Sequence, residues 1–297
     1  MNNSENENPI EKYPQPPFEE QSQEVPGVGE EMNPRPDHGE ESYQGHGLLK
    51  DQAVIITGGD SGIGKATAIA MAREGADILI SYKDDVEDVD AIEATKWVRA
   101  AGRRCVIHKG DIQDEKVCHD IVHTCMKEFG KIDVLINNAA YQMTYDTVEE
   151  VTAEEWNKTF DTNIRAMFFL IKYAKPKMKP GSSIINTTSI NAYKPNPSLF
   201  PYAATKGAIH NLTASLAQKF MEDGSGIRVN AVAPGPVWTP LIPSTIPDHP
   251  EFGKENSPMG RPAQPAEIAP IYVFLASSGA SYVSGATIAA TGGAIAL

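Results

Sequence analysis

The feature that most constrains the fold of this chain is an alternation of short apolar segments with helical segments, which continues from residue 52 to the end. Strands that alternate with helices are typical of βαβ units, whose strands lie parallel in one sheet. Seven apolar segments predict an α/β fold, a doubly wound parallel seven-stranded sheet in three layers. The predicted strands are 53–57, 77–82, 104–108, 132–136, 182–188, 227–233 and 286–290, and predicted helices include 64–74, 114–128, 153–175, 202–222 and 265–276.

The first 48 residues have a different composition. They contain eleven Asp or Glu against Lys12 and Arg35, together with seven Pro and five Gly, and they have little apolar periodicity. Such a segment cannot bury enough surface by itself to offset its ordering entropy. We therefore predict two parts, an acidic segment 1–48 and a single domain 49–297. The segment is either a disordered tail or an arm on a neighbouring subunit, anchored by Tyr13, Phe18 and Tyr43.

Charge and hydropathy exclude some classes of partner. A formal net charge of -13 argues against nucleic acid, because such binders need clustered Lys and Arg. The N-terminus has no apolar leader, and no segment reaches the roughly 18 apolar residues of a membrane-spanning helix. We expect a cytoplasmic protein without membrane contact. Cys105, Cys118 and Cys125 lack metal-ligand spacing, so we expect buried thiols and no metal site.

A glycine-rich loop follows the first predicted strand and precedes a helix. The run is Gly58-Gly59-Asp60-Ser61-Gly62-Ile63-Gly64. Its glycines allow a tight turn, close approach of the backbone and helix-to-strand packing, and the helix N-terminus offers free N–H groups to a pyrophosphate. The spacing GxxxGxG in this context predicts a dinucleotide site in a Rossmann-type domain.

A second set of polar residues predicts a reaction centre. Tyr202 and Lys206 are four residues apart, which places them on one helix face. Ser189 follows a predicted strand, and Asn163 lies in the helix before it. Hydride leaves a carbinol carbon as the hydroxyl proton is removed, so a base must work near neutral pH. We expect the Lys206 ammonium to lower the pKa of the Tyr202 phenol, which favours phenolate.

Together these motifs resemble the short-chain dehydrogenase/reductase family. The resemblance covers about residues 48–297 and rests on the glycine loop, on Asn137-Asn138-Ala139-Ala140, on the tetrad Asn163, Ser189, Tyr202 and Lys206, and on the segment from Asn230 to Thr239. It implies an oxidoreductase in which Tyr202 is the general acid/base, Ser189 bonds the substrate oxygen, Lys206 holds the nicotinamide ribose and Asn163 anchors a water relay. The implied cofactor-binding residues are Gly58, Ser61, Gly62, Ile63, Gly64, Tyr82, Asp84, Asp111, Ile112, Asn138, Ala139, Tyr202, Lys206, Pro234, Gly235, Val237 and Thr239.

The sequence carries mixed signals for cofactor and substrate. An acid after the second strand bonds the adenosine ribose and repels a 2'-phosphate, whereas a base attracts it. Lys83 therefore argues for NADP and Asp84 for NAD, and we expect NAD to be preferred. A proline-rich segment, 239–260, resembles the family's substrate lid. Its mixed polarity is compatible with a small aldehyde, a ketone or a sugar as the carbonyl or alcohol substrate.

Other functions and the assembly stay open at this point. A non-catalytic NAD(P)-binding sensor or scaffold needs the loop without the tetrad, and a dehydratase or epimerase would use the same fold for another reaction. We also expect a homotetramer, because helices 153–175 and 202–222 resemble the family's dimer interface. In this interpretation Leu212, Leu216 and Phe220 face a neighbouring subunit, and the apolar C-terminal run 282–297 forms a second contact.

Overall fold

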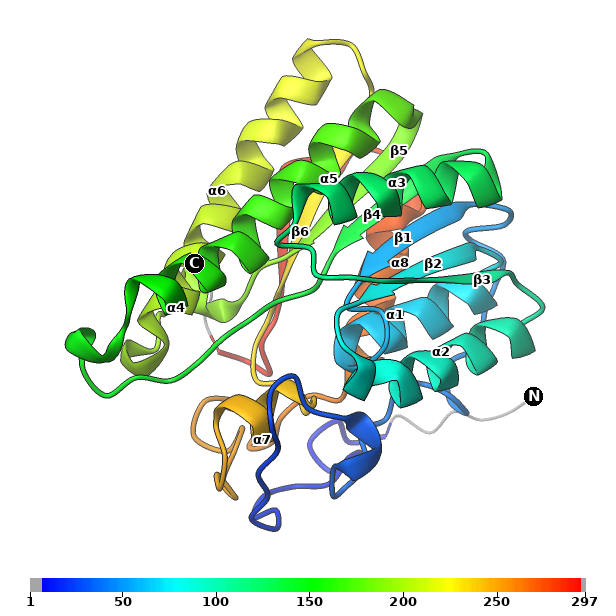
Figure 1. The fold of residues 1–297 in the computed structure, drawn as a ribbon. Coiled ribbons are helices and arrows are strands. Elements are labelled where there is room, and N and C mark those ends of the chain that lie inside the picture. The colour runs from blue at the N-terminus through cyan, green and yellow to red at the C-terminus, as the bar shows by residue number, and fades with distance from the viewer. Residues whose placement is uncertain (1–6, 295–297) are drawn as a thin grey trace.

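The computed structural model describes residues 7–294 and contains one seven-stranded parallel sheet (Figure 1). The strand order is β3-β2-β1-β4-β5-β6-β7, so the chain reverses its winding direction between β1 and β4. The strands are β1 Ala53–Thr57, β2 Asp77–Tyr82, β3 Cys105–Lys109, β4 Ile132–Asn137, β5 Met178–Thr187, β6 Arg228–Pro234 and β7 Thr287–Ala290. The predicted α/β class and strand number are confirmed. Ligands in such sheets bind at the carboxyl ends of the strands, where the winding reverses.

Helices cover both faces of the sheet, which gives the three predicted layers (Figure 1). On one face a buried apolar cluster joins the sheet to α1, α2 and α8, and on the other face a second cluster joins it to α3, α5 and α6. Both clusters form because parallel strands carry apolar residues on both sides. The helices are α1 Gly62–Arg73, α2 Asp88–Ala100, α3 Glu115–Phe129, α4 Ala153–Phe160, α5 Ala166–Ala174, α6 Phe200–Glu222, α7 Leu241–Thr245 and α8 Pro265–Ala276.

The predicted helix 153–175 contains an irregular turn. α4 and α5 are joined by a π-helical segment, Asp161–Arg165, in which Asn163 is buried. Such π segments occur frequently at functional sites. Helix α6 also differs from expectation, because Phe220 is buried and Leu212 and Leu216 pack against the same core. Phe220 therefore stabilises the chain's own core, and a subunit contact through the half-buried Leu212 and Leu216 stays a prediction.

The first part of the chain lies on the rest of the same chain. We call its described residues, 7–48, the arm. Phe18 is buried against Trp238, with ring centroids 4.4 Å apart, and the Tyr43 hydroxyl donates to Glu74 at 2.6 Å. The Tyr13 hydroxyl donates to Asp37 at 3.0 Å. In the structure these aromatic anchors find partners within the same chain, so residues 7–48 lie on their own domain.

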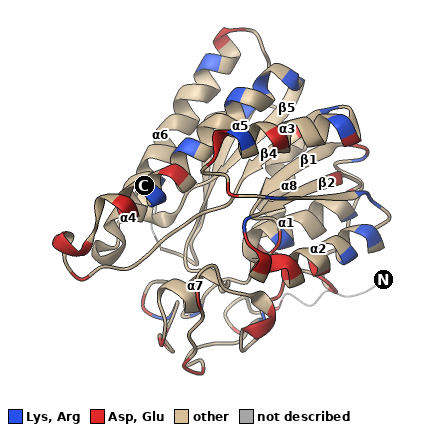
Figure 2. Cartoon of the chain, in the orientation of Figure 1, with Lys and Arg blue, Asp and Glu red and all other residues tan. Residues whose placement is uncertain are grey.

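Charge pairs also fasten the arm. Asp and Glu residues gather at the N-terminal end of α2, beside acidic positions of the arm (Figure 2). Basic side chains compensate them: Arg35 bonds Glu93 at 2.6 Å, and the buried Lys65 ammonium bonds the same carboxylate at 2.6 Å. Elsewhere, the three cysteines are free and buried. No helix within residues 7–294 has the length and apolar character needed to cross a bilayer.

Candidate active site

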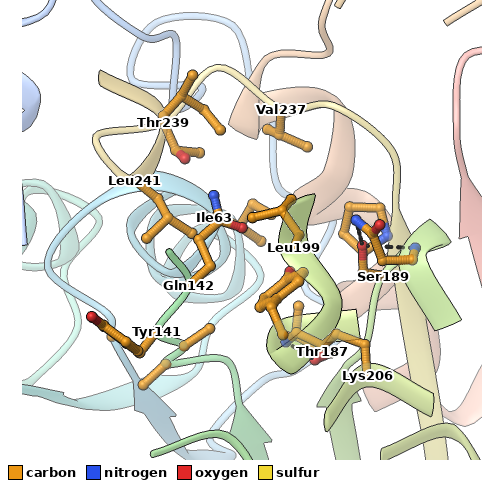
Figure 3. Close-up of a pocket in the computed structure, with 18 of the residues that line it drawn as sticks. Ile63, Tyr141, Gln142, Thr187, Ser189, Leu199, Lys206, Val237, Thr239 and Leu241 are labelled. Carbon is orange, nitrogen blue, oxygen red and sulfur yellow. Dashed lines mark hydrogen bonds between the residues drawn. The ribbon is translucent and has the colours of Figure 1, made fainter. Parts of the chain in front are cut away.

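A cavity of about 830 Å³ opens at the carboxyl ends of the strands, beside the point where the winding reverses. Figure 3 shows Thr187 and Lys206 on the opposite side of it from Val237 and Thr239. The structure brings most predicted residues together here. Those that line the cavity are Gly58, Ser61, Gly62, Ile63, Tyr82, Asp84, Asp111, Ile112, Asn138, Ala139, Ser189, Tyr202, Lys206, Pro234, Gly235, Val237 and Thr239.

Gly64 is a predicted site residue that does not line the cavity. A Cβ atom at this position would lie 1.7 Å from the Gly58 carbonyl oxygen and 2.8 Å from the Asn138 amide nitrogen. Gly64 therefore lets α1 pack tightly against the loop. The Asn138 amide donates to the carbonyls of Thr57 and Gly58 at 3.1 and 3.0 Å, which fixes the loop from the next strand. Sequence spacing separates these residues by 80 positions, and parallel pairing of β1 with β4 brings them together.

The phosphate loop suits a dinucleotide. Helix α1 begins at Gly62, and the side chain of Ser61 at its N-cap makes no capping bond, so the backbone N–H groups of the first turn remain free to bind an anion. Asp60 in the same loop is buried. Burial and the nearby Glu87 raise the pKa of Asp60, so it keeps its proton well above the usual pH range for an aspartate. A neutral carboxyl does not repel a bound pyrophosphate.

The three side chains Ser189, Tyr202 and Lys206 meet on one wall of the cavity. Helix α6 presents Tyr202 and Lys206 one turn apart, and the Lys206 ammonium lies 5.1 Å from the centroid of the Tyr202 ring. That ammonium donates to the Thr187 carbonyl at 2.8 Å, while the Thr188 hydroxyl donates to the Lys206 carbonyl at 2.7 Å. These bonds tie α6 to the end of β5 and hold the two heads at the cavity.

Burial dominates the pKa values of this pair. It raises the pKa of Tyr202 to about 12, which the Ser189 hydroxyl opposes through a hydrogen bond, and it lowers the pKa of Lys206 to about 7. The expected fall in the pKa of Tyr202 was therefore wrong for the chain by itself. Removal of water disfavours the charged form of each group, and the Lys206 ammonium already bonds the Thr187 carbonyl.

Asn163 lies behind the cavity wall. Its side-chain oxygen accepts from the Tyr141 amide at 2.8 Å, and its nitrogen donates to the Tyr141 carbonyl at 2.9 Å and to the Thr205 hydroxyl at 3.0 Å. The Thr205 hydroxyl in turn donates to the Tyr202 carbonyl at 2.7 Å. Asn163 thus fastens the loop after β4 to the first turns of α6, and the π segment is what turns its side chain inward.

Several residues that line the cavity belong to none of the predicted motifs. Polar examples are Gln142, Asn191, Lys194, Asn196 and His249, and apolar Val25 and Pro26 come from the arm. None belongs to a local pattern with a recognisable spacing. The sequence offered no signal for the arm residues, since their position depends on how the arm folds back over the lid.

Comparison with known proteins agrees with this geometry. A family model described as enoyl-(acyl carrier protein) reductase matches residues 58–294. General stress protein 39 of Bacillus subtilis (strain 168) is 48% identical over 270 residues, which cover 90% of this chain and 93% of that protein. The chain belongs to the short-chain dehydrogenase/reductase family. As a short-chain dehydrogenase/reductase it is an oxidoreductase of the NAD(P)-binding type.

Two further relatives of this short-chain dehydrogenase/reductase have informative names. The glucose and ribitol dehydrogenase of Daucus carota is 44% identical over 286 residues, or 94% of this chain and 97% of that protein. A short chain dehydrogenase from Burkholderia cenocepacia J2315, solved in complex with NADP, has a TM-score of 0.77 at 26% identity and covers 83% of this chain and 98% of its own. The expected preference for NAD finds no support in these relatives.

Proposed function

We propose that this chain transfers a hydride reversibly between NAD(P) and a carbonyl or alcohol substrate. The observation that carries the proposal is the meeting of Ser189, Tyr202 and Lys206 on one wall of a cavity that the phosphate loop also lines. The bound dinucleotide supplies the hydride to the carbonyl carbon in reduction and accepts it in oxidation. A non-catalytic sensor or scaffold, in contrast, would need the loop but not these three side chains.

The side chains divide the proton chemistry between them. In reduction the Tyr202 hydroxyl donates its proton to the substrate oxygen, which becomes the alcohol, while Ser189 donates a hydrogen bond to that oxygen. Because the pKa of Tyr202 is about 12, the phenol is protonated at neutral pH and ready to act as an acid. Lys206, with a pKa of about 7, can return a proton to the phenolate near neutral pH. Asn163 is a positioning residue.

The replacement of Tyr202 by Phe tests the proposal. We expect kcat to fall at least about a hundredfold, the usual contribution of a general acid, while the dissociation constant of the cofactor changes by only a few fold. Tyr173→Phe is the matched control, because Tyr173 donates to Glu115 at 2.6 Å and does not line the cavity. Retention of more than about a tenth of wild-type kcat by Tyr202→Phe would locate the acid elsewhere.

For the cofactor we favour NADP(H). Lys83 lines the cavity at the end of β2 with a half-exposed side chain, and its ammonium bonds Asp111 at 3.1 Å. Asp84, the residue that argued for NAD, uses its side chain to accept from the Asp85 amide at 3.0 Å as a helix cap. A 2'-phosphate at the adenosine end would pair with the Lys83 ammonium. The NADP bound by the Burkholderia structure supports this choice.

For the substrate we favour a polyol or the corresponding sugar. The cavity is also lined by amide, ammonium and imidazole groups, which come from Gln142, Asn191, Lys194, Asn196 and His249. Groups of this kind can bond several hydroxyls of one substrate at once. The name of the Daucus relative, a glucose and ribitol dehydrogenase, points to the same class.

A panel of polyols, sugars, simple aldehydes and ketones, each assayed with NAD(H) and NADP(H), tests both choices. We expect the highest kcat/KM with a polyhydroxylated substrate and NADP(H). Lys83→Ser should then lower the NADP-to-NAD preference by about tenfold, the effect of losing roughly 1.4 kcal/mol of phosphate binding. An unchanged preference would show that Lys83 does not reach the 2'-phosphate, and a best substrate without extra hydroxyls would reject the polyol class.

For the assembly we propose a homotetramer. On the face formed by α4 and α5, Trp156 and Phe168 are 40% and 51% exposed, and large apolar side chains in such positions are typical of an interface. They add to the predicted contact through Leu212 and Leu216, which are half-buried on α6. A second contact through the C-terminal run 282–297 stays a prediction, of which residues 295–297 lie outside the described part of the chain. Two different two-fold contacts generate a tetramer.

A further inference from the structure

A segment of the arm forms part of the cavity wall. Val25 and Pro26 line the cavity together with the phosphate loop and the lid, although they precede the first residue of that loop by more than 30 positions. In Figure 1 the arm, in dark blue, runs beside α7 of the lid. The arm therefore contacts the part of the molecule where a dinucleotide would bind.

One glutamine closes this segment into a loop. The Gln23 side-chain oxygen accepts from the Val28 amide at 2.6 Å, and its nitrogen donates to the Val28 carbonyl at 3.2 Å. The backbone amide of Gln23 donates to the Pro243 carbonyl at 3.1 Å, which ties the same loop to α7. Residues 23–28 thus form a closed loop whose tip carries the two cavity-lining residues.

The arm also follows the rest of the lid. The Phe18 amide donates to the Pro250 carbonyl at 2.8 Å, and the Asp248 amide donates to the Gln21 carbonyl at 3.2 Å. The side chains of Phe18 and Met32 are buried with three residues of the lid region, Trp238, Ile242 and Phe252. The lid is therefore packed against the arm, and it can open only if these contacts change.

The arm also approaches the lid closely at Gly27. Its φ is +82°, and a Cβ atom there would lie 2.6 Å from the backbone oxygen of Pro240. The preceding lid residue, Thr239, touches the phosphate loop, because a Cβ at Gly62 would lie 3.0 Å from the Thr239 methyl carbon. A continuous line of contacts therefore runs from the arm through the start of the lid to the N-terminus of α1.

We propose that the loop 23–28 positions the first residues of the lid, 239–241, over the phosphate loop and so retains the bound dinucleotide. The arm is then a structural part of the cofactor site, supplied by the chain's own N-terminal segment. It acts through Pro240 and Thr239, so Gln23 and Gly27 are positioning residues. Loss of the Gly27 contact should loosen the lid and speed release of the cofactor.

The test compares alanine at two glycines of the arm. Gly27→Ala pushes against the Pro240 carbonyl. Gly47→Ala is the matched control, because Gly47 also has a positive φ, +78°, but a Cβ there meets no atom of residues 7–294 within 4 Å. Both changes carry a similar backbone strain. The dissociation constant of NADPH and of NADH is measured by nicotinamide fluorescence, and the release rate by stopped flow, on the full chain.

We expect Gly27→Ala to raise the dissociation constant by about tenfold, mainly through faster release, and Gly47→Ala to stay within about twofold of the wild type. Gln23→Ala opens the loop without a clash and should also raise the dissociation constant of the cofactor. This variant replaces Gly27→Ala in the test if Gly27→Ala does not fold. Equal effects of Gly27→Ala and Gly47→Ala, or an unchanged constant in Gly27→Ala and Gln23→Ala, would overturn the proposal. Because binding is measured without turnover, these outcomes do not depend on the proposed reaction.

Discussion

At the scale of single residues, burial decides the protonation of the groups around the cavity. Asp60, Tyr202 and Lys206 are all 9% exposed or less, and for each of them removal of water is the largest influence on the pKa. Each shift favours the neutral form. Burial thus opposes charge on the side chains of Asp60, Tyr202 and Lys206, at the phosphate loop and at the reaction centre.

The raised pKa of Asp60 predicts how stability depends on pH. Between its ordinary value of 3.8 and the raised value, the folded chain keeps a proton that the unfolded chain has released, so this residue lowers the free energy of unfolding as the pH rises through that window. The amide of Asp60→Asn does not titrate in this window, so the variant lacks this loss of stability. The melting temperature of Asp60→Asn minus that of the wild type should therefore increase from pH 4 to neutral pH.

Differential scanning calorimetry at several pH values measures this difference. Asp146→Asn removes a carboxylate at an exposed position and is the control. If the melting-temperature difference for Asp60→Asn stayed constant over the window, or followed that of Asp146→Asn, Asp60 would be ionised in the folded chain.

At the scale of elements, the arm and α1 depend on each other. Arg73, in the last turn of α1, donates to the carbonyls of Gly39 at 2.9 Å and Tyr43 at 2.6 Å, and it also bonds the carbonyl of Glu40. Backbone groups of an irregular segment need hydrogen-bond partners, and within the arm the Tyr43 amide supplies one by donating to the Gly39 carbonyl at 3.2 Å. The Arg73 guanidinium adds three more bonds and ties this part of the arm to α1.

The loss of this guanidinium should release the arm. Arg73→Met removes three hydrogen bonds to arm carbonyls, and we expect the free energy of unfolding to fall by about 3 kcal/mol, with faster proteolysis within the arm. Arg99→Met, an exposed change on α2, is the control. Urea denaturation and limited proteolysis measure both quantities, and equal stabilities of the two variants would contradict a fastening role for Arg73.

At the scale of the whole molecule, the exposed apolar residues predict the assembly. Light scattering of the full chain should give about four times the chain mass of 32.1 kDa. Phe168→Glu, on α5, should reduce the particle mass, because a charge in an apolar contact is costly to bury. Ile92→Glu, at a 66% exposed position on α2, should leave the mass unchanged. A wild-type particle with the mass of one chain would contradict the proposed tetramer.

The sequence by itself determined the class of fold and the main side chains of the site. β1 and β2 begin and end at the predicted residues, and the glycine loop, Ser189, Tyr202 and Lys206 lie around one cavity as expected. These predictions succeed because the information is local. Strand and helix periodicity, loop spacing and the four-residue interval on a helix are readable without knowing the partners of each element.

Only the tertiary structure decided where the arm lies, which side chains of the site are protonated and which face of α6 is buried. Phe18 and Gly27 contact the lid more than 200 positions further along the chain, which no local pattern encodes. The pKa values of Tyr202 and Lys206 depend on burial by surrounding elements and not on the spacing between the two residues. Likewise Phe220 faces inward because of how α6 packs on the sheet. Each of these properties arises from contacts between distant segments, so it exists only once the chain has folded.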